Sequence, residues 1–193
     1  LFRYISLGEM PLANRFLSAE AVSLTEEVYP LDVFFCEDCY LSQLTEVIPP
    51  EILFREYVYV TSTSDLAVRH ADWLADSVVS RFSLTDQDLV VEIASNDGCV
   101  LKAFNRLGTT TLGVEPARNI AAIAQEQGID TLCDFFSSQV AKSIEQNRGP
   151  AQVIIGRHVL AHVDALRDFV QGISLLLDQK GIVIIEVPYL IDL

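Results

Sequence analysis

Apolar strand-like runs alternate with amphipathic helical segments through the second half of this 193-residue sequence. The run Leu89–Ile93 is apolar except for Glu92, which is typical of a strand buried on both faces. Between residues 166 and 177 apolar residues return every three or four positions, which predicts a helix with one apolar face. Further strands are predicted at Thr110–Val114, 129–132, 151–155 and 182–187, and further helices at 100–107, 116–127 and 137–146. Five such steps predict an α/β fold with a doubly wound parallel sheet.

The first part of the sequence has a different pattern. Short apolar stretches up to about residue 59 are broken by glycine and proline, without a sustained helical period, which predicts a small β-rich module of hairpins and loops. Between residues 66 and 82 a mainly apolar set of residues returns at helical spacing, which predicts a connecting helix. The residues that share one face of it are Ala67, His70, Ala71, Leu74, Val78 and Phe82. We therefore divide the chain into an N-terminal module (1–62), a connecting helix (63–87) and a Rossmann-like domain (88–193).

Composition excludes several classes of protein. The 27 acidic and 13 basic residues give a net charge of −14, which would repel a phosphate backbone, so we expect no nucleic-acid partner. The longest apolar runs are far shorter than the roughly 20 residues that cross a bilayer, so we expect no membrane partner. The four cysteines are irregularly spaced and no leader-like segment opens the sequence, which favours a cytoplasmic protein without disulfides.

A candidate binding site follows the first strand of the predicted sheet. Ligands of such sheets bind outside the carboxyl ends of the strands, near the point where the strand order reverses. Small residues there let the backbone approach a ligand closely, and a strand-terminal carboxylate can hold a cationic or hydroxyl group. The residues that we assign to this turn are Glu92, Ala94, Ser95, Asn96 and Gly98.

A second acid ends the next strand. Glu115, followed by Pro116, occupies the place of the acid that binds the ribose of adenosine-type cofactors. The turn lacks the G-x-G-x-x-G spacing on which a dinucleotide pyrophosphate rests, so NAD is the second choice of cofactor. The spacing fits the first motif of class I S-adenosylmethionine methyltransferases better, because that ligand has no pyrophosphate.

Seven short motifs, in order along nearly the whole chain, resemble those of the sugar C-methyltransferases. They are residues 7–14 (LGEMPLAN), 29–31 (YPL), 36–39 (CEDC), 91–98 (VEIASNDG), 113–116 (GVEP), 160–163 (LAHV) and 186–189 (EVPY). The resemblance implies an S-adenosylmethionine-dependent enzyme with a class I core and a nucleotide-linked keto-deoxysugar as substrate. A base would remove a proton from the carbon next to the sugar carbonyl, and that deprotonated carbon would attack the sulfonium methyl group.

The resemblance also implies a zinc-binding N-terminal module with two Cys-x-x-Cys pairs. Cys36 and Cys39 form one such pair, and a lone pair does not close a four-ligand zinc site unless another ligand is recruited. The family pattern further implies that this chain is truncated at both ends. The first cysteine pair would precede it. The last strands of the sheet and a Tyr-His-Glu-His stretch carrying the general base would follow it, so we expect poor turnover.

Further roles come from the same resemblance. His162, Tyr57 and Tyr59 would line the active site, Phe135 would cover the adenine, and His158 would lie beside the cofactor. Ala94 stands where the family usually has Gly, and His158 where it often has Asn.

Two other interpretations stay open at this point. One is an NAD-dependent sugar oxidoreductase with the same fold, and the other is a non-catalytic binding module. The sequence leaves open the identity of the sugar, the methylated carbon and the oligomeric state.

Overall fold

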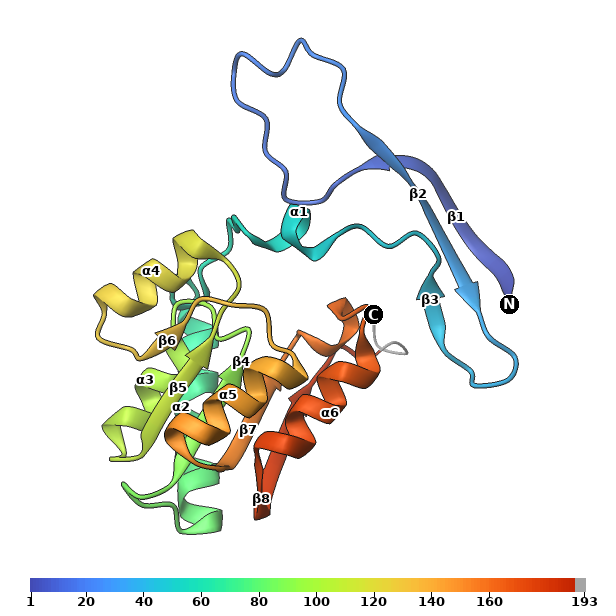
Figure 1. The fold of residues 1–193 in the computed structure, drawn as a ribbon. Coiled ribbons are helices and arrows are strands. Elements are labelled where there is room, and N and C mark those ends of the chain that lie inside the picture. Colours follow the sequence, from blue (N-terminus) through green and yellow to red (C-terminus); the bar gives the residue numbers. More distant parts are fainter. Residues whose placement is uncertain (190–193) are drawn as a thin grey trace. The chain divides into compact units, whose positions relative to one another are not determined.

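A computed structural model describes residues 1–189 and divides the chain into two compact units, which separate between Val58 and Tyr59 (Figure 1). The first unit contains strands β1 (Phe2–Pro11), β2 (Val28–Phe35) and β3 (Ser42–Leu44) and the short helix α1 (Pro50–Phe54). The second unit contains every other helix and strand of the described residues. Within residues 1–189 no helix is both long and apolar enough to cross a membrane.

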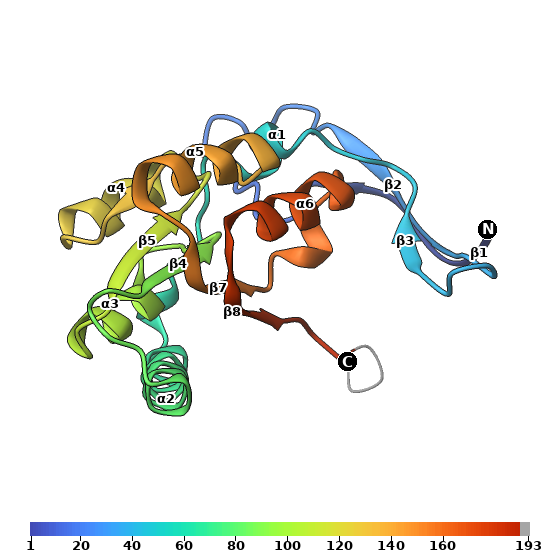
Figure 2. The same cartoon turned by 60° about the horizontal axis from the view of Figure 1, so that its bottom comes forward.

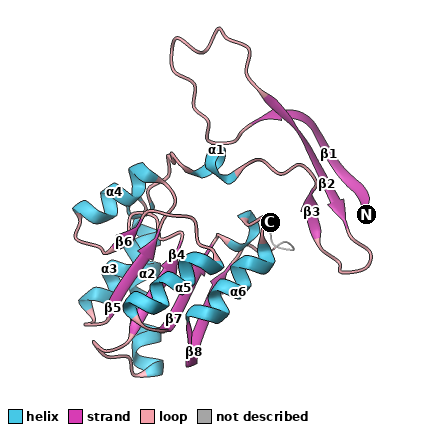
Figure 3. Cartoon of the chain, viewed as in Figure 1, coloured by secondary structure: helices cyan, strands magenta, loops and turns pink. Residues whose placement is uncertain are grey.

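The strands of the first unit form an antiparallel sheet in the order β1-β2-β3 (Figure 3). Phe2 pairs with Phe35, and Val33 with Leu44. Among residues 1–58, all of which the structure describes, none is fully buried. The prediction of a small β-rich module is thus confirmed, and its sheet lacks the thick apolar core that stabilises larger domains.

The second unit is built on a five-stranded parallel sheet in the order β6-β5-β4-β7-β8. Its strands are β4 (Leu89–Ile93), β5 (Thr110–Val114), β6 (Thr131–Leu132), β7 (Ala151–Arg157) and β8 (Leu177–Glu186). The chain moves outward from β4 to β6 and then returns to the other side of β4 with β7. The strand order therefore reverses at β4 and β7, where parallel sheets of this kind bind ligands.

Helices cover both faces of this sheet. They are α2 (Asp65–Phe82), α3 (Cys99–Arg106), α4 (Arg118–Glu126), α5 (Ser138–Arg148) and α6 (Leu166–Leu176). One core cluster joins Val90 of β4 to α2 and α3, and a second joins Val91 of β4 to α5 and α6. Figure 2 shows these two pairs of helices on opposite sides of the strands. Neighbouring residues of β4 point to opposite faces, which explains why the strand is apolar on both faces, with Glu92 as its one polar residue.

Helix α2 begins with a side-chain cap. The Ser64 hydroxyl accepts the Ala67 N–H, and the helix ends at Ser83 in a left-handed conformation. The predicted apolar face is buried at Ala71, Leu74 and Val78. Phe82, which we also placed on that face, is 43 % exposed because it lies in the last turn, at the rim of the core. The helix packs on the parallel sheet within the second unit.

Three elements begin more than one residue away from their predicted starts. Helix α4 begins at Arg118 and not at Pro116, because Ala117 has extended backbone angles and serves as the N-cap. Strand β6 is limited to Thr131–Leu132, since Ile129 is buried in the core against Gly98. The last strand begins at residue 177 and not at 182, because the chain extends directly after α6 and pairs with Ala151.

Candidate functional site

The turn after β4 has an unusual backbone. Ala94, Asn96 and Gly98 all adopt positive φ angles, of 55°, 52° and 74°. Such angles suit glycine, are tolerated by asparagine and are strained for alanine. The family's preference for Gly at the position of Ala94 thus has a physical reason here. The turn reverses the chain at the carboxyl end of β4 and leads into α3.

Two glycines allow close packing around this turn. A Cβ atom on Gly98 would lie 2.9 Å from the side chain of Ile129. A Cβ atom on Gly113, in the neighbouring strand β5, would overlap the Ser95 hydroxyl and lie 3.1 Å from Leu101. The absence of a side chain at both positions brings β5 and the turn together.

Glu115 fixes the turn from the end of β5. One carboxylate oxygen accepts the N–H of Asn96 at 2.7 Å and the other accepts the N–H of Ala117 at 2.8 Å. Burial raises the pKa of Glu115, and the two backbone hydrogen bonds oppose that rise. The carboxylate therefore has a fixed orientation at the edge of the sheet, and each oxygen retains a further lone pair for a ligand.

Glu92 is the buried acid of the site. Its side chain is 3 % exposed, and Oε2 has no hydrogen-bond partner among residues 1–189. The same holds for Ser95 Oγ and Asp97 Oδ1, which belong to the following turn. Burial raises the pKa of Glu92 to about 8, and Arg157 lowers it in part. Buried polar atoms without partners are costly, so their gathering at one strand end indicates a place for a polar ligand.

The segment before α2 packs against the same turn. The Asn96 side chain accepts the Thr61 N–H at 2.8 Å and donates to the Tyr59 carbonyl at 3.0 Å. The second oxygen of Asp97 accepts the Ser62 N–H at 3.2 Å. Tyr59 is thus brought to the candidate cofactor turn through its backbone, whereas Tyr57 belongs to the first unit.

The other predicted residues lie on loops at the carboxyl ends of the strands. Half-buried Pro116 directly follows Glu115, and half-buried Phe135 lies between β6 and α5. His158 follows β7 with a φ angle of 52°, which explains the family's frequent Asn at this position. His162 is exposed in a short 3-10 turn (Leu160–His162), where its N–H donates to the Val159 carbonyl.

A cluster of polar side chains around Glu186, at the ends of β7 and β8 and on α2, was missed by the sequence interpretation. Glu186 Oε2 lies 3.0 Å from Arg157 Nε and 2.9 Å from His70 Nε2, and Oε1 lies 2.9 Å from His158 Nε2. Partial burial alone would raise the pKa of Glu186, but hydrogen bonds from Arg157 and His70 hold it at about 2. Glu186 is the last residue of β8, and Glu92 and Glu115 also lie within one residue of the carboxyl end of a parallel strand. This shared position is the sequence signal that could have identified Glu186.

Cys36 and Cys39 lie in a tight turn after β2. The Cys36 N–H donates to the Leu41 carbonyl, and the Cys36 carbonyl accepts the Tyr40 N–H. Hydrogen bonds from Cys39 and from the Asp38 backbone lower the pKa of the Cys36 thiol, which favours the thiolate that binds zinc. No group of three or more His, Cys, Asp or Glu side chains within residues 1–189 is arranged to hold a metal. The described residues thus supply two ligands and do not fit a closed zinc site.

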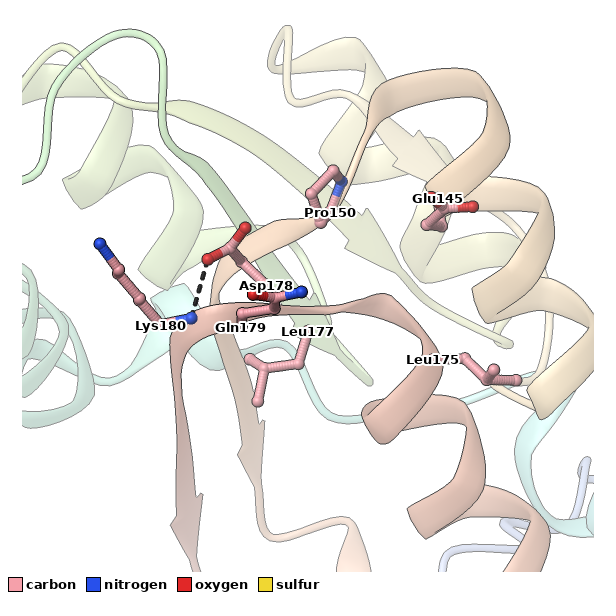
Figure 4. A pocket seen from close by; sticks show the side chains of 7 residues that line it. All are labelled: Glu145, Pro150, Leu175, Leu177, Asp178, Gln179 and Lys180. Carbon is pink, nitrogen blue, oxygen red and sulfur yellow. Dashed lines mark hydrogen bonds between the residues drawn. The ribbon is translucent and has the colours of Figure 1, made fainter.

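The structure also has a hollow of about 520 Å³ at the opposite edge of the sheet, where β7 and β8 begin (Figure 4). It is lined by Glu145, Pro150, Leu175, Leu177, Asp178, Gln179 and Lys180. The Asp178 side chain accepts the Lys180 N–H at 2.8 Å, which closes the turn beside it. None of the predicted site residues lines this hollow.

The strand order and the acids at the strand ends define an α/β protein with its ligand site at the carboxyl edge of a parallel sheet. Residues 68–192 match the family model described as "Methyltransferase domain", and the chain belongs to this family. Residues 1–54 match the model described as "Putative zinc binding domain".

One curated relative and one solved structure extend this assignment. The chain is 39 % identical over 189 residues to the C-methyltransferase NovU of Streptomyces niveus. The match covers 98 % of this chain and 45 % of that protein, so the chain spans less than half of the relative's length. The crystal structure of Streptomyces venezuelae DesVI is similar with a TM-score of 0.51 and 16 % identity, covering 63 % of this chain and 51 % of that one. The latter likeness supports the fold alone.

Proposed function

We propose that the protein is an S-adenosylmethionine-dependent C-methyltransferase whose cofactor binds at the turn after β4. The observation that carries the proposal is the pair of buried carboxylates, Glu92 and Glu115, at the ends of two neighbouring strands. Glu115 is oriented by two backbone N–H groups, and Glu92 has an oxygen without a partner among the described residues. The similarity to a C-methyltransferase supports the same conclusion.

The polar side chains at this turn match the polar groups of the cofactor. Glu115 offers acceptors for the two ribose hydroxyls, and Glu92 with Asp97 offers acceptors for the ammonium group. When bound, the cofactor supplies an electrophilic methyl group on a sulfonium sulfur. The turn residues Ala94, Ser95, Asn96 and Gly98 would lie along it, with Pro116, Phe135 and His158 at its sides.

For the substrate we propose a nucleotide-linked keto-deoxysugar, on the basis of the seven ordered motifs. The exposed His162 on the loop after β7 and Tyr59, both of the second unit, would contact the sugar. A cytoplasmic location belongs to the same proposal. It is supported by the four cysteines, which are all free and within the described residues.

Isothermal titration calorimetry with S-adenosylhomocysteine tests the cofactor assignment. We expect saturable binding of one molecule per chain, and no binding of NADH at the same concentration. Binding of NADH in place of S-adenosylhomocysteine would favour the oxidoreductase, and binding of neither would contradict the proposed cofactor site.

A further inference from the structure

The cluster centred on Glu186 joins three separate elements of the second unit. Arg157 and Glu186 are register partners at the ends of β7 and β8, and the Glu186 carbonyl also accepts the N–H of His158 at 2.7 Å. The carboxylate contacts the Arg157 guanidinium through both oxygens, at 3.0 and 3.4 Å. His70 reaches it from α2. A two-point contact of this kind fixes the plane of the guanidinium.

Arg157 is the least exposed member of the cluster, with 12 % of its side chain accessible, compared with 55 % for His158 and 37 % for His70. Strand β7 also lies beside β4, and Ile93 pairs with Gly156, the residue before Arg157. Glu186 therefore fixes Arg157 next to the strand that carries Glu92. A cation held at this position acts on the buried acid through a medium that screens charge poorly.

The charges that act on Glu92 have opposite signs. Arg157 favours the ionised carboxylate, whereas Glu115 of β5, Asp97 of the turn and Glu186 of β8 disfavour it. Burial disfavours it most strongly. Burial and three acids oppose the ionisation of Glu92. Among these contributions, only that of Arg157 favours the ionised carboxylate near neutral pH.

We propose that Arg157 is a positioning residue of the cofactor site, held by Glu186, and that it keeps Glu92 able to accept a cationic group of the ligand. This inference depends on the proposed function of the site. Its consequence is that ligand binding is linked to proton release. The Glu92 carboxyl loses its proton to solvent as the ammonium group of the ligand arrives. Affinity for the ligand therefore rises with pH, and it stops rising at the pH where Glu92 is already ionised in the ligand-free protein.

The test compares two ligands and four proteins by calorimetry between pH 6 and 9. S-adenosylhomocysteine carries an ammonium group, whereas 5′-methylthioadenosine shares its adenosyl part and lacks that group. The proteins are the wild-type chain, Arg157→Gln, Arg157→Lys and the control Arg148→Gln. Arg148 forms an exposed ion pair with Asp130 and so provides a matched loss of one arginine charge.

For Arg157→Gln we expect affinity for S-adenosylhomocysteine at pH 7 to fall roughly tenfold. The midpoint of the rise in affinity should move up by about one pH unit. Arg157→Lys keeps the charge and should restore most of the affinity, and Arg148→Gln should match the wild type. Binding of 5′-methylthioadenosine should be the same in all four proteins.

An unchanged pH profile in Arg157→Gln would overturn the inference and leave the proposed function standing. The inference would fail in the same way if both ligands lost affinity equally, or if Arg157→Lys behaved like Arg157→Gln, because either result indicates a merely structural role. A wild-type chain that binds neither ligand would instead contradict the proposed function, and the inference with it.

Discussion

The carboxylate of Glu115 accepts the backbone N–H of Asn96 at 2.7 Å, and this contact ties the end of β5 to the turn after β4. The same side chain accepts the N–H of Ala117 before α4. One acid thus organises both loops that border the candidate cofactor site. Its structural role and its proposed ligand role therefore have to be separated by experiment.

Replacing Glu115 should weaken both stability and binding. Glu115→Ala leaves a buried N–H group at Ala117 and a half-buried one at Asn96 without acceptors, and we expect a loss of about 2–4 kcal/mol in the free energy of unfolding. Glu115→Gln retains one acceptor and should lose about 1–3 kcal/mol, since its NH₂ group cannot accept the second N–H. Urea denaturation measures these losses.

The ligand role of Glu115 is tested with the folded Gln variant. We expect at least a tenfold loss of affinity for S-adenosylhomocysteine, because a charged acceptor for the ribose is removed. Glu126→Gln, an exposed position on α4, serves as the matched control and should change neither property. Unchanged affinity in Glu115→Gln would remove the proposed ribose contact.

Ala94→Gly should stabilise the protein. The φ angle of 55° costs an L-residue roughly 1–2 kcal/mol, and the greater flexibility of glycine in the unfolded chain offsets part of the gain. We expect a net increase of about 0.5–1 kcal/mol in the free energy of unfolding. The control Ala122→Gly, at an exposed position within α4, should instead lose about 1 kcal/mol. Equal losses from both substitutions would contradict the strained turn.

Gly98 and Gly108 allow a paired comparison of strain and crowding. Their φ angles are 74° and 86°, but only at Gly98 would a Cβ atom meet another side chain, that of Ile129. Gly108→Ala should lose about 1 kcal/mol from its backbone conformation. Gly98→Ala should lose about 1–3 kcal/mol more, because Ile129 has to move. Similar melting temperatures for the two variants would show that Ile129 moves aside from a Cβ atom at position 98 at little cost.

The raised pKa of Glu92 predicts a pH dependence of stability. Its pKa is about 8 in the folded protein and 4.5 ordinarily, so between these values the folded chain holds a proton that the unfolded chain has released. The stability that Glu92 contributes is therefore present below about pH 4.5 and is lost as the pH rises to about 8. The effect is on the order of a few kcal/mol.

Glu92→Gln should remove this dependence, since glutamine does not ionise. Urea denaturation at pH 5 and pH 8 should show the variant gaining stability relative to the wild type at the higher pH. Glu186, whose pKa is held at about 2, ionises outside this range and should contribute little to the difference. A constant difference between Glu92→Gln and the wild type at both pH values would contradict a raised pKa.

The parallel sheet could be predicted from the sequence because its strands are buried on both faces. Val90 and Val91 pack into different core clusters, so both faces of β4 are apolar apart from Glu92, and this pattern is visible without the structure. The element ends were harder to predict. Where β6 begins depends on Ile129 packing against Gly98, which is a contact between distant parts of the sequence.

Only part of the candidate site could be predicted from the sequence. Glu92 and Glu115 follow from their positions at strand ends, which local pattern defines. The contacts of Glu186 with Arg157, His158 and His70 depend on β8 lying beside β7 and on α2 covering that end of the sheet. His70, interpreted from the sequence as a residue of the helix face, is 116 positions away from its partner Glu186.

The most direct test of the central claim is an amide NMR titration of the ¹⁵N-labelled chain with S-adenosylhomocysteine. The N–H groups of Asn96 and Ala117 donate to Glu115 and so report on that carboxylate. If the cofactor binds between Glu92 and Glu115, both signals should shift saturably with the ligand, while the amide of Lys180 beside the hollow stays unchanged. Stationary signals for Asn96 and Ala117 at saturating ligand, or shifts confined to the surroundings of Lys180, would contradict the account.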